Sequence, residues 1–531
     1  MLQLFGVLLL ALTSALLAQM AYNKYDYHRK VKKFGCGEMV VAKNGFLGWK
    51  GLRAVLAVLK TKQGPAALKE RIDAYGRTYV FHIGPAPVIS THEPENIKAM
   101  LATQFKDFSL GTRYRSLAPT LGDGIFTLDG HGWTHSRALL RPQFAREQVS
   151  RLDSLEHHFQ ILRMCIDKEM KQHGNDPRGF DIQNLFFLFT LDSATEFLFG
   201  SSVDSLVDSL DDPSVKTGDH GGVDEAARKG FNNSFNKAQE LCALRSRLHT
   251  LYWIVGSVVK KEPFEKYNKE VKAFVDFFAA KALKARKEKD MSLMDNDQYI
   301  FMYELVKETT NPVTLRDQML NILLAGRDTT ASMLSWIYFR LARDPKLYAK
   351  LREAILEDFG TNPESITFES LKQCDYLRYV LNESLRLYPV VPINGRTATR
   401  DTTLPRGGGP DQSQPIFIPK GSTVSYSVYW THRDERFWGQ DAEEFIPERW
   451  DPRNGNIGRG WEYLPFNGGP RICLGQQFAL TEVGYVLSRL VQTYETLETC
   501  DHKPLPPLFN HALTMCHEEG VWVKMYKGEK A

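Results

Sequence analysis

Near its C-terminal end the chain reads Phe466-Asn-Gly-Gly-Pro-Arg-Ile-Cys-Leu-Gly475, and this short run limits the possible folds sharply. It places one cysteine, Cys473, between two glycines and two positions after an arginine. A thiolate here is a suitable axial ligand for a haem iron, because it pushes electron density toward the opposite face, where dioxygen is cleaved. A free cysteine has a pKa of about 8.5, and both the iron and inward-pointing loop amides would favour its thiolate. The run therefore predicts a loop that lies under one face of a haem.

The residues around Cys473 suit such a loop. Gly469 and Gly475 lack a Cβ atom, so the backbone can lie close to a flat porphyrin and adopt φ angles that other residues avoid. Arg471 would reach a haem propionate as a charge-assisted pair, and Phe466 is the aromatic residue at the start of the run. The alternative, a glycine-rich turn with a buried free cysteine, is disfavoured because several fixed positions would have to coincide.

The composition indicates one large domain. The chain has 531 residues, of which 43% are hydrophobic and 11% aromatic, so a large core can be filled. The sequence shows neither a linker nor an internal repeat, and its net charge of +4 does not favour nucleic-acid binding. The seven cysteines are scattered and have no Cys-x-x-Cys spacing. This disfavours a disulfide framework or a zinc site and indicates a reducing compartment.

The N-terminal residues predict a membrane anchor. No charged residue occurs from Met1 to Asn23, and Leu2–Ala18 is mostly Leu, Ala, Val and Phe, about the length of a helix that crosses a bilayer. Basic residues follow between Lys24 and Lys33, so the positive-inside rule places the rest of the chain in the cytosol. A cleaved signal peptide is the alternative, but it requires a basic first segment. We expect a transmembrane signal-anchor at 1–22, a membrane-proximal segment at 23–60 and a catalytic domain at 61–531.

The remaining chain reads as mostly helical with a few short strands. A hairpin is expected from Thr78–Ile83 and Pro87–Ser90, around Gly84-Pro85. Ser201–Gly222 is rich in Asp, Ser and Gly and is expected to be an exposed loop. Lys261–Lys289 is expected to be a long amphipathic helix on the surface.

A second group of candidate residues lies in the longest predicted helix. Pro312 and the pair Asp344-Pro345 bound roughly thirty residues, a helix of about 45 Å. Its middle reads Ala-Gly-Arg-Asp328-Thr329-Thr, where the small residues leave room above a haem for dioxygen. The Thr329 hydroxyl can bond the distal oxygen, and Asp328 could feed it protons, since oxygen scission needs two protons in order. Alternatively Thr329 caps or bends a core helix and Asp328 forms a surface pair; Cys473 downstream favours the relay.

A helical pair of opposite charges, Glu383 and Arg386, lies on one face of an otherwise apolar helix. The same spacing recurs at Glu225 and Arg228, but in a polar stretch. Further on, Phe445–Trp450 supplies another arginine, Arg449. A buried carboxylate needs such partners, because unpaired it would cost several kcal/mol.

Taken in chain order, these motifs resemble those of the cytochrome P-450 superfamily. Its pattern Phe-x-x-Gly-x-Arg-x-Cys-x-Gly is matched at every fixed position by residues 466–475. The resemblance implies a mainly α fold with small β-sheets (α+β), in one large haem domain that binds iron protoporphyrin IX (heme b) through Cys473. It also implies a buried triad for structure and haem retention, Glu383, Arg386 and Arg449, and propionate contacts from Trp133, Arg137 and Arg396. An isolated Trp-x-x-x-Arg match is otherwise a packed tryptophan beside an exposed arginine.

Within the superfamily the chain is most similar to the fungal alkane- and fatty-acid-hydroxylating group, on residues 122–130, 396–409 and 473–482. That group implies terminal (omega) hydroxylation of long unbranched chains at the endoplasmic reticulum membrane, with molecular oxygen. Electrons come from NADPH through a separate FAD- and FMN-containing reductase, and cytochrome b5 and membrane lipid are further expected partners. The chain itself has no Gly-x-Gly-x-x-Gly run opening a βαβ unit and no spare length for flavin domains. Arg141, Arg146 and Arg151 are candidate docking residues, or else an ordinary solvated helix face.

Three functions are compatible with at least part of these motifs. A monooxygenase is favoured; a haem-thiolate isomerase or dehydratase is disfavoured by Asp328-Thr329, and a non-enzymatic haem- or lipid-binding membrane protein by motifs for both haem faces. An intermediate of a specialised biosynthetic pathway is the alternative to an alkane or fatty acid as substrate. The candidate apolar wall of a substrate pocket, each member of which could instead be core, consists of Ile125, Phe126, Leu323, Leu324, Ala325, Val391, Ile393 and Leu513.

Overall fold

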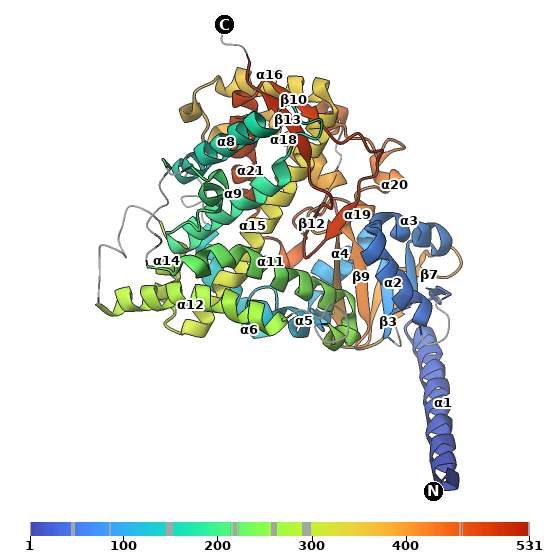
Figure 1. Cartoon of the computed structure of the whole chain (residues 1–531). Helices are drawn as coiled ribbons and strands as arrows, with labels where there is room; N and C mark the ends of the chain where they lie inside the picture. The colour runs from blue at the N-terminus through green and yellow to red at the C-terminus, as the bar shows by residue number, and fades with distance from the viewer. Residues whose placement is uncertain are drawn as a thin grey trace.

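The computed structural model is mainly helical with small sheets, as the sequence predicts (Figure 1). It describes residues 2–43, 48–83, 86–144, 152–212, 214–215, 220, 222–255, 263–288, 299–455, 458 and 460–528. The helices are α1 Leu2–Lys33, α2 Trp49–Thr61, α3 Gly64–Tyr75, α4 Pro94–Lys98, α5 Arg113–Leu121, α6 Gly130–Leu140, α8 Asp153–His173, α9 Ile182–Phe199, α10 Ser205–Leu210, α11 Glu225–Arg247, α12 Phe264–Glu288, α14 Phe301–Glu308, α15 Pro312–Arg343, α16 Pro345–Phe359, α17 Phe368–Gln373, α18 Asp375–Leu387, α19 Val428–Thr431, α20 Glu435–Trp438 and α21 Gln476–Thr493. The strands are β1 Val40–Val41, β2 Thr78–Ile83, β3 Ala86–Thr91, β4 Phe108–Ser109, β5 Phe180–Asp181, β6 Ile393–Ala398, β7 Thr402–Gly408, β8 Gln414–Ile418, β9 Thr423–Ser427, β10 Thr496–Thr499, β11 Phe509–His511, β12 Met515–His517 and β13 Trp522–Tyr526.

The largest sheet has the strand order β1-β2-β3-β9-β6-β4. β2 and β3 form the predicted hairpin, with Thr78 opposite Thr91, while Gly84-Pro85 lies outside the described residues. β9 pairs with β3 in parallel and with β6 in antiparallel fashion, with Asn394 opposite Tyr426. The sheet therefore joins N-terminal strands to β6, and β6 carries Asn394 and Arg396 into the wall of the site.

The long helix α15 runs through the middle of the helical part (Figure 1) and contacts α9, α12 and α21. It begins where the sequence predicts, because the Asn311 side chain accepts hydrogen bonds from the first free N–H groups of the helix and Pro312 follows it. It ends before Asp344, whose carboxylate caps α16 in the same way. Most of its residues are buried, as a helix crossing the core of a large domain must be.

Of two expectations about surface segments, one needs correction and the other is confirmed. Ser201–Gly222 is not only an exposed loop: it contains α10, whose Leu206 and Val207 are buried and whose first N–H groups donate to Asp192 at 2.7 and 2.8 Å. The amphipathic helix expected at Lys261–Lys289 is present as α12. Its apolar face is buried, with Phe274 stacked on Phe231 of α11 at 4.1 Å between ring centroids. Residues 213, 216–219, 221, 261–262 and 289 lie outside the described part.

Helix α1 projects from the body of the structure (Figure 1). Its C-terminal end contacts the domain, since Lys30 pairs with Asp401 at 2.9 Å and the Phe34 ring packs on Phe417 of β8 at 5.1 Å. Within the part of the chain that the structure describes, no helix reaches the length and apolarity that a membrane crossing demands.

Candidate active site

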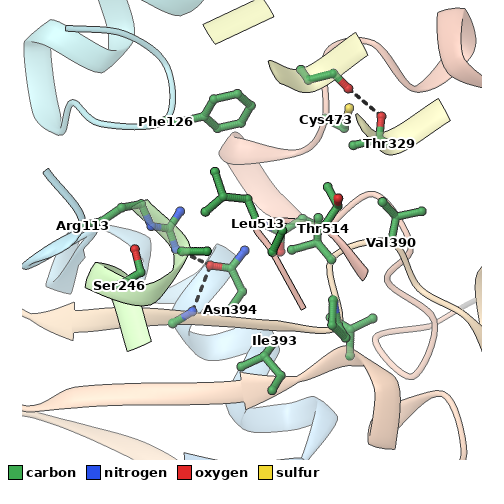
Figure 2. A pocket seen from close by; sticks show the side chains of 18 of the residues that line it. Arg113, Phe126, Ser246, Thr329, Val390, Ile393, Asn394, Cys473, Leu513 and Thr514 are labelled. Atoms are coloured by element: carbon green, nitrogen blue, oxygen red, sulfur yellow. Dashed lines mark hydrogen bonds between the residues drawn. The ribbon is translucent and has the colours of Figure 1, made fainter. Parts of the chain in front are cut away.

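A cavity of about 740 Å³ lies between α15, the Cys473 loop, β6 and the C-terminal loop around Leu513. Its wall is mostly apolar, with a few charged and hydroxyl groups. In Figure 2, Cys473 and Thr329 lie on one side of the cavity, and Arg113, Asn394 and Ser246 lie on the other. Such a concave, largely apolar space with few polar groups is the usual form of a cofactor and small-molecule site.

Positions 469 and 475 of the Cys473 loop differ in whether a residue other than glycine would fit. Gly469 has φ +69°, and a Cβ there would overlap the carbonyl oxygen of Leu101, so only glycine fits. Gly475 has an ordinary φ of −90°, and a Cβ there would meet only an aromatic ring at 3.4 Å. The expectation of an unusual backbone conformation therefore holds for Gly469 and not for Gly475.

Cys473 lines the cavity and its side chain is exposed there. Its N–H donates to the Phe466 carbonyl at 3.0 Å, which ties the two ends of the loop together. Burial raises the pKa of the thiol, and the Gly475 N–H and the charge of Arg137 oppose this effect. The loop thus supplies one amide, and α6 supplies one cation, that would stabilise a thiolate bound to a metal.

Arginines surround one edge of the cavity. Arg137, Arg396 and Arg471 line it, as expected for propionate contacts, and Arg113 at the start of α5 lines it as well. Among the described residues a single carboxylate, Asp129, contacts any of them, accepting from Arg471 at 2.8 Å. Burial lowers the pKa of both Arg113 and Arg471 to about 10. This excess of buried positive charge requires an anion, because unpaired buried charges are costly.

Trp133 and the expected arginines do lie together. The Arg471 guanidinium stacks over the Trp133 ring at 4.4 Å, and Arg137 donates to the Ile472 carbonyl at 3.0 Å. Arg396 donates to Asn394 Oδ1 at 3.2 Å, while its buried Nε has no partner among the described residues. The two propionates of a haem would satisfy these donors, so the cysteine, the arginine edge and the apolar walls fit haem.

Arg113 is a residue that sequence reasoning missed. Its guanidinium donates to the same Asn394 Oδ1 that Arg396 uses, so one amide joins the two arginines. Asn394 is on β6, far from Arg113 in the sequence. No local motif marks Arg113, and the only signal is its place just before the glycine-rich segment 122–130.

Glu383, Arg386 and Arg449 lie together in the interior. Glu383 is fully buried and accepts from Arg386 Nη2 at 2.8 Å, and Arg449 Nε lies 3.4 Å from the carboxylate. Arg386 also donates to the His432 carbonyl at 3.0 Å. The His432 ring in turn accepts the N–H of Leu464 at 2.7 Å, two residues before the Cys473 loop. The group therefore fixes the chain that enters that loop.

Thr329 and Asp328 point to different sides of α15. The Thr329 hydroxyl lines the cavity and donates to the Ala325 carbonyl at 2.6 Å. Asp328 does not line the cavity: it is buried and accepts from Arg327 at 3.1 Å. Burial raises the pKa of Asp328, and the Arg327 charge opposes this. Successive helical residues are turned by about 100°, so the structure does not bring the expected acid–hydroxyl pair together.

A different acid approaches the cavity side of α15 and was also missed. Glu482 of α21 is buried and accepts from the Ser193 hydroxyl at 2.7 Å. Burial raises its pKa to about 7, opposed by the hydroxyls of Ser193 and Thr330. Thr330 lines the cavity beside Thr329. A glutamate in an apolar helix directly after the Cys473 loop is the signal that would have identified it.

The expected apolar wall is largely present, with one exception. Leu323 does not line the cavity; it is fully buried in the core shared by α15, α11 and α12. The other expected residues line the cavity: Ile125, Phe126, Leu324, Ala325, Val391, Ile393 and Leu513.

Comparison with known proteins agrees with this site. A family model described as Cytochrome P450 matches residues 48–525. Cytochrome P450 52A12 of Debaryomyces hansenii is 49% identical over 532 residues, which cover 98% of this chain and 97% of that one. Cytochrome P450 52A6 of Candida tropicalis is 48% identical, with 97% and 96% covered. Cytochrome P450 52A10 of Candida maltosa is 53% identical, with 82% and 81% covered.

Family match, relatives and site geometry lead to one conclusion. The chain belongs to the cytochrome P-450 family, and it is a haem-thiolate monooxygenase that uses molecular oxygen and NADPH electrons delivered by a separate reductase.

Proposed function

We propose that this monooxygenase hydroxylates the terminal carbon of long unbranched chains, either n-alkanes or fatty acids. The observation that carries the proposal is the cavity, which extends from Cys473 and Thr329 past Phe126 and Leu513 to the residues of α2 and α3. An unbranched chain can bury its length against this apolar wall at about 25 cal/mol per Å² and present one end to the Cys473 side. The resemblance to the alkane- and fatty-acid-hydroxylating group supports the same substrate class.

Bound haem would supply the activation of dioxygen and the oxidation of the C–H bond. The chain supplies the Cys473 thiolate, the arginines that hold the propionates, and a proton at the Thr329 hydroxyl. Glu482 and the Thr330 hydroxyl lie on the same side of α15 and offer a proton from the interior. For Asp328 to act as predicted, its carboxylate must part from Arg327 and turn toward Thr329.

We further propose a single-pass protein of the endoplasmic reticulum membrane. Residues 1–22 would be the transmembrane signal-anchor, 23–60 the membrane-proximal segment and 61–531 the cytosolic haem domain. The uncharged start of the chain and the basic residues that follow it support this arrangement. Helix α1 also leaves the body of the structure (Figure 1), as an anchor would.

The reductase would dock on a basic face that includes Arg141, with cytochrome b5 as a second electron donor. Arg141 is exposed directly after α6, the helix that carries Trp133 and Arg137. Arg146 and Arg151, the other predicted docking residues, lie outside the described residues. A docking face near the propionate edge of the haem would shorten the path of the electrons.

Product analysis tests the proposal. The full-length protein in membranes, with its reductase and NADPH, is supplied with an n-alkane and with a long-chain fatty acid. Terminal alcohols or ω-hydroxy acids are expected. Haem-loaded protein that oxidises neither compound would overturn the substrate class and leave the monooxygenase assignment standing.

A further inference from the structure

Away from the arginines around Arg471, Arg247 is a cation in the cavity wall for which the described residues provide no acidic partner. Arg247, the last residue of α11, lines the cavity together with Ser246. Arg247 Nη2 donates to the Ala512 carbonyl at 3.2 Å, and no carboxylate of the described residues pairs with it. Burial lowers the pKa of Arg247 to about 10, and no nearby negative charge offsets this effect. A guanidinium held in this way is a site for an anion.

The neighbouring cations of the cavity wall make other contacts. Lys62, which also lines the cavity, pairs with Glu518 at 2.9 Å. Arg113 shares Asn394 with Arg396 and so belongs to the propionate edge. Arg71, which lines the cavity as well, lies with its guanidinium over the Phe81 ring at 5.4 Å. Among the described residues Arg247 differs from these three in that its guanidinium contacts a backbone carbonyl and neither an acid, a ring nor a shared amide.

The position of this cation relative to the reacting centre limits the kind of ligand. In Figure 2, Ser246 lies across the cavity from Cys473 and Thr329, the apolar side chain of Leu513 is drawn between them, and Phe126 is drawn to one side. The cavity thus has a reactive side, an apolar middle and a cationic side. A long apolar chain with one terminal carboxylate has the matching distribution of charge.

We infer that Arg247, together with the Ser246 hydroxyl, binds the carboxylate of a long-chain fatty acid and so directs the opposite, methyl end of the chain toward Cys473 and Thr329. The inference rests on the proposed function and selects the fatty acid among its substrates. Guanidinium and carboxylate form two parallel charge-assisted hydrogen bonds, whereas an alkane has no group for Arg247. The arrangement also gives a physical reason for oxidation at the terminal carbon, because the fixed carboxylate sets how far the chain reaches.

Binding measurements on haem-loaded, full-length protein test this inference. The absorbance change of the haem is titrated with a long-chain fatty acid, with its methyl ester and with the n-alkane of equal length. Arg247→Met should raise the Kd for the acid about 10-fold or more and change the Kd for ester and alkane less than about two-fold. Arg247→Lys, which keeps the charge but not the paired N–H donors of the guanidinium, should recover part of the affinity.

Arg245→Met is the matched control. Arg245 is two residues earlier on the same helix, but its guanidinium donates to the Arg115 carbonyl at 2.9 Å and lies over the Tyr252 ring, outside the cavity wall. The Arg245→Met variant should bind the fatty acid with the Kd of the wild type.

Two results would overturn the inference. They are an unchanged Kd for the acid in Arg247→Met, and an equal loss of acid and alkane binding. Terminal hydroxylation by the wild type would then still stand, whereas a wild type that oxidises neither compound removes the proposed function itself. If Arg247→Met does not incorporate haem, the wild type decides: equal affinity for the acid and its methyl ester overturns the inference.

Discussion

Thr329 is the residue whose side chain bears most directly on the oxygen chemistry. It donates to Ala325 at 2.6 Å, and its oxygen lone pairs remain free to accept at the cavity wall. We predict that Thr329→Ala binds haem and consumes NADPH but forms at least about 10-fold less product per NADPH, because no hydroxyl holds a proton there. Ser335→Ala is the control: Ser335 makes the same kind of bond, to Ala331 at 2.6 Å, on the same helix but outside the cavity wall. Equal coupling in both variants would contradict the proton role.

Glu482 should make stability depend on pH. Its pKa of about 7 lies above the ordinary 4.5, so between these values the folded protein keeps a proton that the unfolded chain has lost. The contribution of Glu482 to the free energy of unfolding is therefore complete below about pH 4.5 and is lost as the pH rises through about 7. Glu482→Gln cannot ionise and should be more stable than the wild type at about pH 8, by up to about 3 kcal/mol, with little difference at about pH 5. Denaturant unfolding of the haem-loaded proteins at both pH values measures this, and a difference independent of pH would contradict it.

Single residues differ in how well the sequence identifies them. Cys473 and Thr329 can be found because their neighbours in the chain are also their neighbours in the site. Arg113 is much harder to find, because it gains its role from Asn394, which the fold brings from a distant segment. Glu482 has a signal in the chain, its place in an apolar helix after the Cys473 loop, but its partner Ser193 comes from a distant segment. The sequence could not predict the side of α15 to which Asp328 points, for a similar reason. Arg327 donates to Asn232 and Asn236 of α11, and it also donates to the Asp328 carboxylate.

At the scale of elements, the buried Glu383 connects α18 to the segment before the Cys473 loop. It accepts from Arg386 at 2.8 Å, from the Ile446 N–H at 2.8 Å and from the Trp450 indole at 3.0 Å. We predict that Glu383→Ala lowers the free energy of unfolding by about 3–5 kcal/mol, because it leaves buried arginines without their carboxylate, and that little haem is incorporated. The haem absorbance per mole of purified protein is the measurement.

Glu225→Ala is the control for Glu383→Ala, because Glu225 precedes Arg228 at the same spacing. Here the pattern is accidental: Arg228 pairs with Asp208 at 2.8 Å, and the exposed Glu225 pairs with Lys229 at 2.7 Å. Full haem content is expected in this variant. A similar loss of haem in both variants would remove the special role of Glu383.

The Cys473 loop offers a second comparison between two like substitutions. Gly469→Ala must move either the loop or the Leu101 carbonyl, because φ is +69° and a Cβ would overlap that oxygen. Gly475→Ala needs only a small adjustment of an aromatic ring. We predict that Gly469→Ala loses most of its bound haem and that Gly475→Ala retains it. Haem absorbance and thermal midpoints check both variants, and equal haem content would show that the loop tolerates a side chain at either position.

Long elements with clear boundaries could be predicted, and short ones could not. Pro312 and Asp344-Pro345 mark the ends of α15 through local chemistry alone, so its length was predictable. Helix α10 is short, and its cap is supplied by Asp192 of another helix. Its composition reads as a loop because the stabilising partner lies outside the segment, on the preceding helix α9.

At the scale of the whole molecule, the cavity is assembled from both ends of the chain. Val55 of α2 and Ala67 of α3 line it together with Leu513 near the C-terminus. α2 follows α1 along the chain and lies next to the point where α1 leaves the body (Figure 1). An anchor at residues 1–22 would therefore hold this side of the cavity toward the bilayer, where apolar substrates dissolve.

Deletion of residues 2–22 tests that arrangement. The deletion removes the uncharged start of α1 and keeps Lys30 and Phe34, which bind α1 to the domain through Asp401 and Phe417. We predict that the shortened protein incorporates haem normally and oxidises dispersed substrate, because no contact of the cavity is lost. In cell fractionation it should leave the carbonate-washed membrane pellet, in which the full-length chain remains, because the deletion removes the uncharged run that we propose as the anchor. If the shortened protein stays in the washed pellet to the same extent, the anchor lies elsewhere in the chain.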